Sequence, residues 1–335
     1  MKRNYGLDFL KCICAFMVVC IHTSFPGIVG KAVVPICRIA VPLFFMITGY
    51  YYSNTSSKKK ELKQIGKIFR LVVLTNIVYF VFSVMQCLQS GDSLPSFLRS
   101  ALSIKSILKF VLLNDSPFGV HLWYLGAILY VLLIVFVIER KWDRKCLYPI
   151  VPILLLTDLV LGKYSLLLLG RTFPYILVRN FLCVGLPYFL IGDMLFRYKI
   201  RMKSRNTLIL SVVFAGVTLA ERYLLGRFEL NTTRDHYIGT TFMAVCVFLS
   251  ALHYEGGKES KIKNAVCFAG SKLSTNIYIL HPMFIYVMAV FMKRIVRNNT
   301  VETVYGYAAP FIIFFISAAV SLVLYRISTG KKKTD

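Results

Sequence analysis

Charged side chains are scarce in this chain. Only 16% of its 335 residues are Asp, Glu, Lys or Arg, and only 15 of these are acidic. A soluble domain of this length usually has about a quarter of its residues charged. No polar stretch is long enough to fold as a separate soluble domain, and no internal repeat is visible. These deficits argue against an ordinary soluble protein and against a repeat array.

Paired cysteine motifs are absent as well. The chain has nine Cys but no CxxC pair, and several, such as Cys12, Cys20 and Cys246, lie in or beside apolar runs. A free Cys in such a run behaves as a small apolar residue. We therefore expect neither a disulfide framework nor a metal site. A cleavable signal peptide is not expected either, because Asp8 and Lys11 interrupt the first apolar run and no small-residue cleavage site follows.

Apolar residues dominate the composition. They make up 57% of the chain, the mean hydropathy is +0.66, and they form long runs such as Leu122–Ile138. Such runs are long enough to cross about 30 Å of hydrocarbon as helices. We predict an all-α, polytopic membrane bundle with about ten transmembrane helices. The spans are expected at roughly 6–26, 32–52, 68–88, 121–139, 147–162, 176–196, 207–225, 237–254, 273–293 and 305–326.

The formal charge of +25 is best explained by membrane topology. If both termini are cytoplasmic, 24 of the 40 Lys and Arg fall in cytoplasmic segments and 11 in outer segments. This is the bias that sets the orientation of membrane helices. We therefore expect no nucleic-acid partner, and we predict one integral membrane domain over 1–335.

Ionisable residues inside apolar spans are candidates for function, because each costs about 2.5–3.5 kcal/mol at a helix centre. Lys11 and His22 are eleven residues apart, or about three helical turns, and Asp8 lies one turn before Lys11. These three residues therefore share one stripe, in which Asp8 can pair with Lys11 and His22 faces the bundle. The other candidates are Arg38, Arg70, His121, Arg179, Arg222 and His281.

Several of these candidates have a plainer interpretation. Lys11, Arg70, Arg179 and Arg222 can reach a membrane surface with their long side chains. His121, Trp123 and Tyr124 are also typical of an interfacial cap at a helix end. The expected depths nevertheless separate an outer polar group (His22, Arg38, His121 and Arg179) from an inner one (Asp8, Lys11, Arg70 and the basic residues of 58–67).

Five ordered segments carry a family resemblance. They are "NYGLDFLKCICAFMVVCIHT" with Asp8, Lys11 and His22; "RIAVPLFFMITGYYYS" from Arg38; "KIFR" ending at Arg70; "HLWYLGAILY" from His121; and "STNIYILHPMF" with His281. Together they resemble the acyltransferase-3 family of integral membrane acyltransferases over nearly the whole chain. Pro42 stands where many members have Asp, and no Glu follows Trp123 within the segment. The chain therefore resembles the subgroup that includes cell-surface acetyl- or succinyltransferases and the membrane halves of serine racemases.

The resemblance implies an O-acyltransferase that moves an acetyl, or a succinyl, group from cytoplasmic acyl-CoA to a hydroxyl of a cell-surface or exported carbohydrate. It implies catalytic roles for His22, Arg38 and His281, with His22 as general base or acyl carrier. Lys11, Lys67 and Arg70 are expected to bind acyl-CoA, and His121, Trp123 and Tyr124 to bind the acceptor. The expected setting is a bacterial plasma membrane, with no cofactor bound.

Two other functions remain open from the sequence. Intramembrane charges are also typical of a secondary transporter for a small polar solute such as an amino acid, although transporters often show internal repeats. The chain is also compatible with a non-catalytic partner of polysaccharide export.

Overall fold

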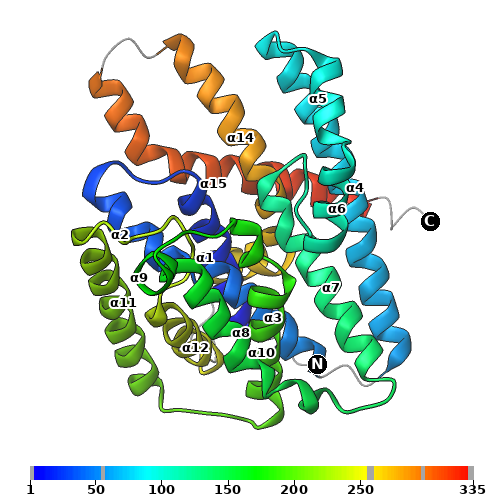
Figure 1. Cartoon of the computed structure of the whole chain (residues 1–335), viewed down its shortest axis with the longest axis vertical. Coiled ribbons are helices and arrows are strands. Elements are labelled where there is room, and N and C mark those ends of the chain that lie inside the picture. Colours follow the sequence, from blue (N-terminus) through cyan, green and yellow to red (C-terminus); the bar gives the residue numbers. More distant parts are fainter. Residues whose placement is uncertain (1–3, 54–56, 255–259, 296–298, 331–335) are drawn as a thin grey trace. The chain divides into compact units, whose positions relative to one another are not determined.

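The computed structural model describes residues 4–53, 57–254, 260–295 and 299–330, and within them it contains helices and no strand (Figure 1). The chain forms two compact units. Unit 1 comprises 1–44, 201–227 and 236–335, and unit 2 comprises 45–200 and 228–235. The boundary at 44/45 lies inside helix α3 (Ala40–Ser53).

The prediction of an all-α polytopic membrane bundle is confirmed, with a difference in the count. Eight of the described helical segments are long and apolar enough to cross a membrane. Two of the ten expected spans are shorter: α12 has 15 residues, and η5 with α10 covers Phe181–Arg197. At 1.5 Å per residue, α12 reaches only about 22 Å. The eight are Tyr5–His22, Gly27–Ser53, Lys58–Ser90, Val120–Ile138, Arg144–Lys163, Ser204–Arg227, Lys261–Arg294 and Thr300–Gly330.

Unit 1 is built around α1 (Tyr5–His22). Asn4 caps this helix through its side-chain oxygen, which accepts a hydrogen bond from the Leu7 N–H at 2.9 Å. Helix α1 packs against most of the other elements of the unit, while α11 and α12 run side by side (Figure 1). The other elements are α2 (Gly27–Cys37), α11 (Ser204–Arg227), α12 (Ile238–Leu252), α13 (Lys261–Phe268), η6 (Ala269–Leu273), α14 (Ser274–Ile295) and α15 (Asn299–Gly330).

Glycines let backbones approach α1 closely. A Cβ at Gly270 of η6 would lie 1.7 Å from the carbonyl oxygen of Asp8, and a Cβ at Gly6 would lie 1.8 Å from that of Ala251. Small residues give such close packing between membrane helices, where van der Waals contact contributes much of the association energy. The apolar core beside these contacts comprises Ala15, Val19, Leu273, Ile277 and Ile313.

Unit 2 starts with the second half of α3, and α10 (Leu186–Arg197) is the last helix of its 45–200 segment. Gly49 and Gly192 bring α3 and α10 together, because a Cβ at either position would lie about 2 Å from a backbone oxygen of the other helix. The remaining elements are α4 (Lys58–Ser90), α5 (Leu94–Ala101), α6 (Ile104–Leu113), η1 (Val120–Leu122), α7 (Trp123–Ile138), η2 (Arg144–Leu147), α8 (Ile150–Asp158), η3 (Leu159–Lys163), α9 (Ser165–Leu169), η4 (Tyr175–Leu177) and η5 (Phe181–Gly185).

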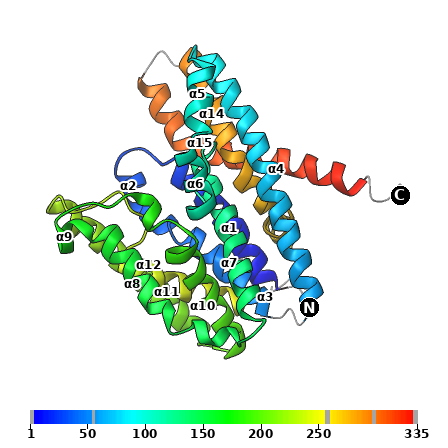
Figure 2. The same ribbon diagram turned by 45° about the vertical axis from the view of Figure 1, so that its right-hand side comes forward.

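The expected connection over 89–120 is largely helical. It contains α5 and α6, which turn back along the C-terminal half of α4 before the chain enters α7 (Figure 2). Ser103 caps α6 by accepting a hydrogen bond from the Ser106 N–H. The sequence places this segment between the expected spans 68–88 and 121–139 and predicts it only as a connection.

A buried ionic network lies at one end of unit 2. Asp193 in α10 is fully buried, and Arg144 donates a hydrogen bond to its Oδ1 at 3.1 Å. Tyr148 donates to Oδ2 at 2.5 Å, and the Ser53 hydroxyl also donates to Asp193. The Nε of Arg144 bonds Glu139 Oε1 at 2.6 Å. A buried carboxylate is tolerated only with such charged and hydrogen-bonding partners.

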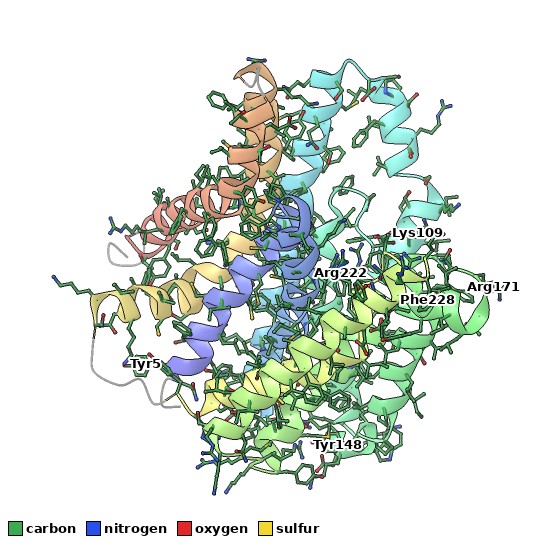
Figure 3. All side chains as sticks on the ribbon, turned by 90° about the vertical axis from the view of Figure 1, so that its left-hand side faces the viewer. Tyr5, Lys109, Tyr148, Arg171, Arg222 and Phe228 are labelled. Carbon is green, nitrogen blue, oxygen red and sulfur yellow. The ribbon has the colours of Figure 1, made fainter. Side chains whose placement is uncertain are left out.

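Arg197 extends this network outward. It lies 3.3 Å from Asp193 and 2.9 Å from Asp143. The backbone N–H of Lys145 and the Arg197 guanidinium hold the pKa of Asp143 below its usual value. Figure 3 shows Tyr148 at one end of the α8 and α10 pair and Arg171 at the other end. The network therefore joins α3, α7, η2 and α10 at a single end of the unit.

The approach of η6 to α1 predicts that Gly270→Ala destabilises the protein. A methyl group against a backbone oxygen forces the two elements apart, and such overpacking costs about 1–3 kcal/mol. Thermal unfolding of the purified protein in detergent measures the change. Gly216→Ala in α11 is the matched control, because a Cβ there meets nothing within 4 Å. Equal melting temperatures for the two variants would contradict the packing argument.

The ionic network predicts a large loss of stability for Arg144→Met. Removing one partner of a buried ion pair leaves an uncompensated charge and costs about 3–5 kcal/mol. We expect Asp193→Asn, added to Arg144→Met, to recover part of this loss, because the amide carries no charge. Lys145→Met is the control, since the Lys145 side chain is exposed. Additive effects of the two network substitutions would show that Arg144 and Asp193 are not coupled.

Candidate functional site

Two histidines from opposite ends of the sequence meet in unit 1. His22 is the last residue of α1, and His281 lies in α14. Their ring centroids are 5.1 Å apart, with an angle of 48° between the ring planes. The packing of α14 against α1 brings them together. The sequence predicts catalytic roles for His22 and His281 but does not show whether the two side chains meet.

Hydrogen bonding to the backbone fixes the orientation of His281. Its Nδ1 lies 2.7 Å from the carbonyl oxygen of Tyr278 and 3.3 Å from that of Ile277. A carbonyl oxygen only accepts hydrogen bonds, so we assign the Nδ1 atom as protonated. In the neutral ring the Nε2 atom then carries the basic lone pair. His281 is fully buried, so packing also holds this orientation.

His22 is more exposed than expected. His22 is exposed, although the stripe of α1 to which it belongs was expected to face the bundle. The middle of that stripe is indeed buried, at Ala15 and Val18. Helix α1 ends at His22, and the chain then turns through Thr23 to Pro26. His22 therefore has one side against His281 and another side accessible.

The predicted ion pair between Asp8 and Lys11 is present. The Lys11 Nζ lies 3.5 Å from Asp8 Oδ1, and Asp8 is buried while Lys11 is half-buried. The pair is one turn apart on α1, so it partly neutralises a carboxylate within a mostly apolar helix. The predicted pairing is therefore present, and the structural role of the pair and the acyl-CoA role of Lys11 stay predictions.

Arg38 lies at the junction of two helices. It follows the last residue of α2, is half-buried, and donates its backbone N–H to the carbonyl of Val34 at 3.2 Å. Helix α2 also packs against α1. Arg38 thus occupies the same unit as His22 and His281, and its catalytic role stays a prediction.

The predicted acceptor residues cluster at the start of α7 in unit 2. His121 and Trp123 are buried, and Tyr124 is half-buried. The His121 ring packs edge-on against Tyr79 with a centroid distance of 4.5 Å. Tyr124 packs edge-on against Phe45 at 4.8 Å. Because these rings are buried within the unit, they form a packed cluster and not only a polar cap at the membrane interface.

Two arginines extend this cluster. The Arg179 guanidinium lies 5.6 Å from the Trp123 ring centroid and 4.3 Å from that of Tyr175. Arg234 lies 4.8 Å from the same Tyr175 ring and also donates to the carbonyl of Phe173. Both arginines are half-buried. Together the residues form a cationic aromatic cluster at the end of unit 2 opposite the Asp193 network, because Trp123 begins α7 and Glu139 follows its end.

The predicted acyl-CoA residues are divided between the units. Lys11 lies on α1 in unit 1, whereas Lys67 and Arg70 are exposed on α4 in unit 2. The basic run Lys58–Lys60 at the start of α4 is exposed as well. An exposed basic helix end suits an anionic ligand. A joint acyl-CoA site for Lys11, Lys67 and Arg70 remains a prediction.

Sequence analysis missed several prominent polar residues. Asp193 lies within the predicted sixth span, so the rule that selected Arg38 and His22 also selects it. Arg144, Tyr175 and Arg234 lie outside or near the ends of the predicted spans, and only tertiary packing shows their partners. Among the described residues, no group of three or more His, Cys, Asp and Glu is arranged to hold a metal ion.

Comparisons with known proteins find relatives that carry the name of racemases. An amino-acid racemase of Enterococcus faecalis is 26% identical over a 349-residue alignment that covers 93% of this chain and 45% of the racemase. A serine/alanine racemase of Enterococcus gallinarum is 28% identical over 137 residues, covering 38% of this chain and 18% of that protein. The chain thus spans less than half the length of these relatives. No solved structure matches significantly.

The decisive comparison is with a family model. The model described as an acyltransferase domain matches residues 4–326, which include parts of both units and every candidate site residue. Because the match covers nearly the whole chain, this protein belongs to the Acyl_transf_3 family of acyltransferase domains.

Proposed function

We propose that this protein is a membrane O-acyltransferase that moves an acetyl, or a succinyl, group from cytoplasmic acyl-CoA to a hydroxyl of a cell-surface or exported carbohydrate. The observation that supports this most strongly is the contact between His22 and His281 in a chain of the acyltransferase family. The proposed setting is a bacterial plasma membrane with both termini in the cytoplasm.

The proposed chemistry needs a base that works near neutral pH, and imidazole is suited to that task. As the acceptor hydroxyl attacks the thioester carbonyl, a bond forms between its oxygen and the acyl carbon. His22 takes the hydroxyl proton. The carbon–sulfur bond then breaks, and His22 gives this proton to the CoA thiolate, so His22 returns to its starting state. In a two-step variant, His22 first carries the acyl group and then transfers it to the acceptor.

His281 and Arg38 have supporting roles in this proposal. The Nδ1 hydrogen bonds to the carbonyls of Tyr278 and Ile277 hold the His281 ring beside His22. His281 can thereby orient His22 or share its proton. The Arg38 guanidinium is positively charged throughout the physiological pH range and suits the thioester oxyanion or an anionic acceptor.

The remaining predicted groups supply binding. The exposed Lys67 and Arg70 on α4, with Lys11, are proposed to hold the acyl-CoA phosphates. His121, Trp123 and Tyr124 are proposed to hold the acceptor, since aromatic rings offer apolar faces and hydrogen-bonding edges to a sugar. The adjacent Arg179 and Arg234 add positive charge to this cluster. That charge favours an anionic acceptor or a succinyl donor.

A second candidate function is transport of a small amino acid. The observation that favours it is that the two Enterococcus relatives are named amino-acid racemase and serine/alanine racemase. Counterflow of labelled serine in proteoliposomes tests it. Counterflow by the wild-type protein, combined with no acyl transfer from acetyl or succinyl donors, would favour this candidate.

The proposed base predicts that His22→Ala removes acyl transfer. General bases contribute about 10²–10⁴-fold to rate, so we expect a loss of at least about a hundredfold. The measurement supplies radiolabelled acetyl-CoA to membranes with matched amounts of protein and follows label into a base-labile ester on surface glycan. His253→Ala, which lies in unit 1 at the end of α12, is the control. Equal label with His22→Ala and wild type would return His22 to a structural role.

The cationic aromatic cluster predicts an acceptor-binding defect for Arg179→Gln. Loss of the charge beside Trp123 and Tyr175 should raise the acceptor KM roughly tenfold, equivalent to about 1.4 kcal/mol, and change kcat less. Arg171→Gln is the matched control, because Arg171 also lies over an aromatic ring, that of Phe173, but is exposed (Figure 3). Unchanged KM in both variants would place the acceptor elsewhere.

A further inference from the structure

An apolar groove of about 480 Å³ lies along α4 in unit 2. Several of its lining residues, including Val73 and Ile77, are more than 40% exposed, so the groove opens to the exterior of the unit. The segment Val120–Ile138 and α4 are both candidate membrane spans, and the exterior at this depth is hydrocarbon. The walls include Phe69, Val73, Ile77 and Phe80 from α4 and Leu129 and Tyr130 from α7.

The polar residues of the groove bond within the protein. The Asn76 amide donates to the carbonyl of Val72 at 2.8 Å, and its oxygen accepts from Ser116 at 2.7 Å. The Asn114 amide donates to the Trp123 carbonyl at 3.0 Å, and its oxygen accepts from the Phe181 N–H at 3.1 Å. The Tyr130 hydroxyl donates to the Val111 carbonyl. A polar ligand would have to compete with these bonds, whereas a hydrocarbon chain would leave them intact.

The size of the groove suits one long chain. At about 30 Å³ for a group the size of a water molecule, the volume accommodates on the order of sixteen such groups. The wall on α4 extends from Phe69 to Phe80, a separation of eleven positions or about 16 Å along the helix. The groove is therefore long and narrow enough for a single extended alkyl or isoprenoid chain.

One end of the groove adjoins the proposed acceptor residues. Phe118 lines the groove and packs edge-on against Phe80 at 5.2 Å. A Cβ placed on the next residue, Gly119, would lie 3.0 Å from the His121 ring and 3.3 Å from the Tyr79 ring. Asn114 joins the groove wall to the Trp123 backbone. A chain in the groove would thus bring the group attached to it toward the start of α7.

Charge near the groove favours an anionic head group. The segment 94–113 that forms α5 and α6 contains Arg99, Lys105 and Lys109 and no acidic residue. Leu102 and Phe110 of the same segment line the groove. Lipid tails are as apolar as the groove itself, so hydrophobicity alone gives little selectivity inside a membrane. The basic segment supplies the selectivity, because it attracts a phosphate linked to the chain.

We propose that this groove binds the hydrocarbon chain of the acceptor, which is a hydroxylated head group joined through phosphate to one long chain. The chain lies along α4 and α7 with the head group near His121 and Trp123. The identification of the bound molecule as the acceptor rests on the proposed acyl transfer. The binding of a hydrocarbon chain in the groove is independent of that proposal.

The test uses the full-length protein in nanodiscs and a photoreactive probe. The probe is a hexose phosphate ester of a long-chain alcohol with a diazirine halfway along the chain. A phosphatidylcholine with the same diazirine chain is the second arm. We expect the hexose phosphate probe to label peptides from 69–80 and 110–118, at least fivefold more than the phosphatidylcholine does. Equal labelling by both probes, or labelling spread evenly over lipid-facing helices, would overturn the proposal.

Two groove-filling variants sharpen this result. Val73→Trp and Ile77→Trp should each reduce groove labelling at least fivefold, because an indole ring occupies the space of the chain. Val81→Trp is the matched control, since Val81 lies on the same helix, is 52% exposed, and does not line the groove. Equal labelling in all three variants would overturn the proposal even if one groove variant folds poorly.

An activity measurement separates the two proposals. With acetyl-CoA as donor, Val73→Trp should lose transfer to the lipid-linked hexose and keep transfer to the free hexose phosphate. Transfer to neither acceptor by the wild-type protein, with selective labelling intact, would count against the acyl transfer and leave the groove assignment standing. Equal loss toward both acceptors would contradict the assignment of the groove to the acceptor chain.

Discussion

The packing of other elements on helix α1 is the constraint on which the His22–His281 contact depends. In hydrocarbon, every backbone polar group must be bonded within the protein, so the chain is restricted to helices. Helices then associate through van der Waals contact, which requires small residues at the interface. Gly6 and Gly270 meet this requirement on and opposite α1. Gly6 lets α12 approach α1, whereas Gly270 lets η6, and with it α14, approach α1, and thus determines where His281 lies relative to His22.

Unit 2 differs from unit 1 in that it buries a charged network. Asp193 is fully buried, yet Arg144, Tyr148, Ser53 and Arg197 surround its carboxylate with hydrogen bonds and positive charge. The partners come from several segments, so the network holds one end of the unit together. The other end carries the cationic aromatic cluster around Tyr175. The groove runs along α4, and one of its ends adjoins the start of α7 beside this cluster.

Family membership and local geometry support the proposed chemistry in separate ways. The match over 4–326 identifies the acyltransferase domain. It does not specify which side chain acts on which atom. The hydrogen bonds of His281 Nδ1 to backbone carbonyls supply a physical reason for one tautomer, and the ring contact supplies a reason for pairing His281 with His22.

The sequence by itself determined the helical class, the membrane setting and the positions of eight of the ten expected spans, because long apolar runs satisfy their backbones in lipid as helices. It also determined the Asp8–Lys11 pair, since residues one turn apart must be neighbours on a helix. Tertiary structure decided the rest. It brought His22 to His281 across most of the chain, left His22 exposed at a helix end, gave Asp193 its partners, and folded 94–113 into helices beside a groove. Each of these depends on which faces of distant helices pack together, and apolar periodicity within one helix carries no information about that choice.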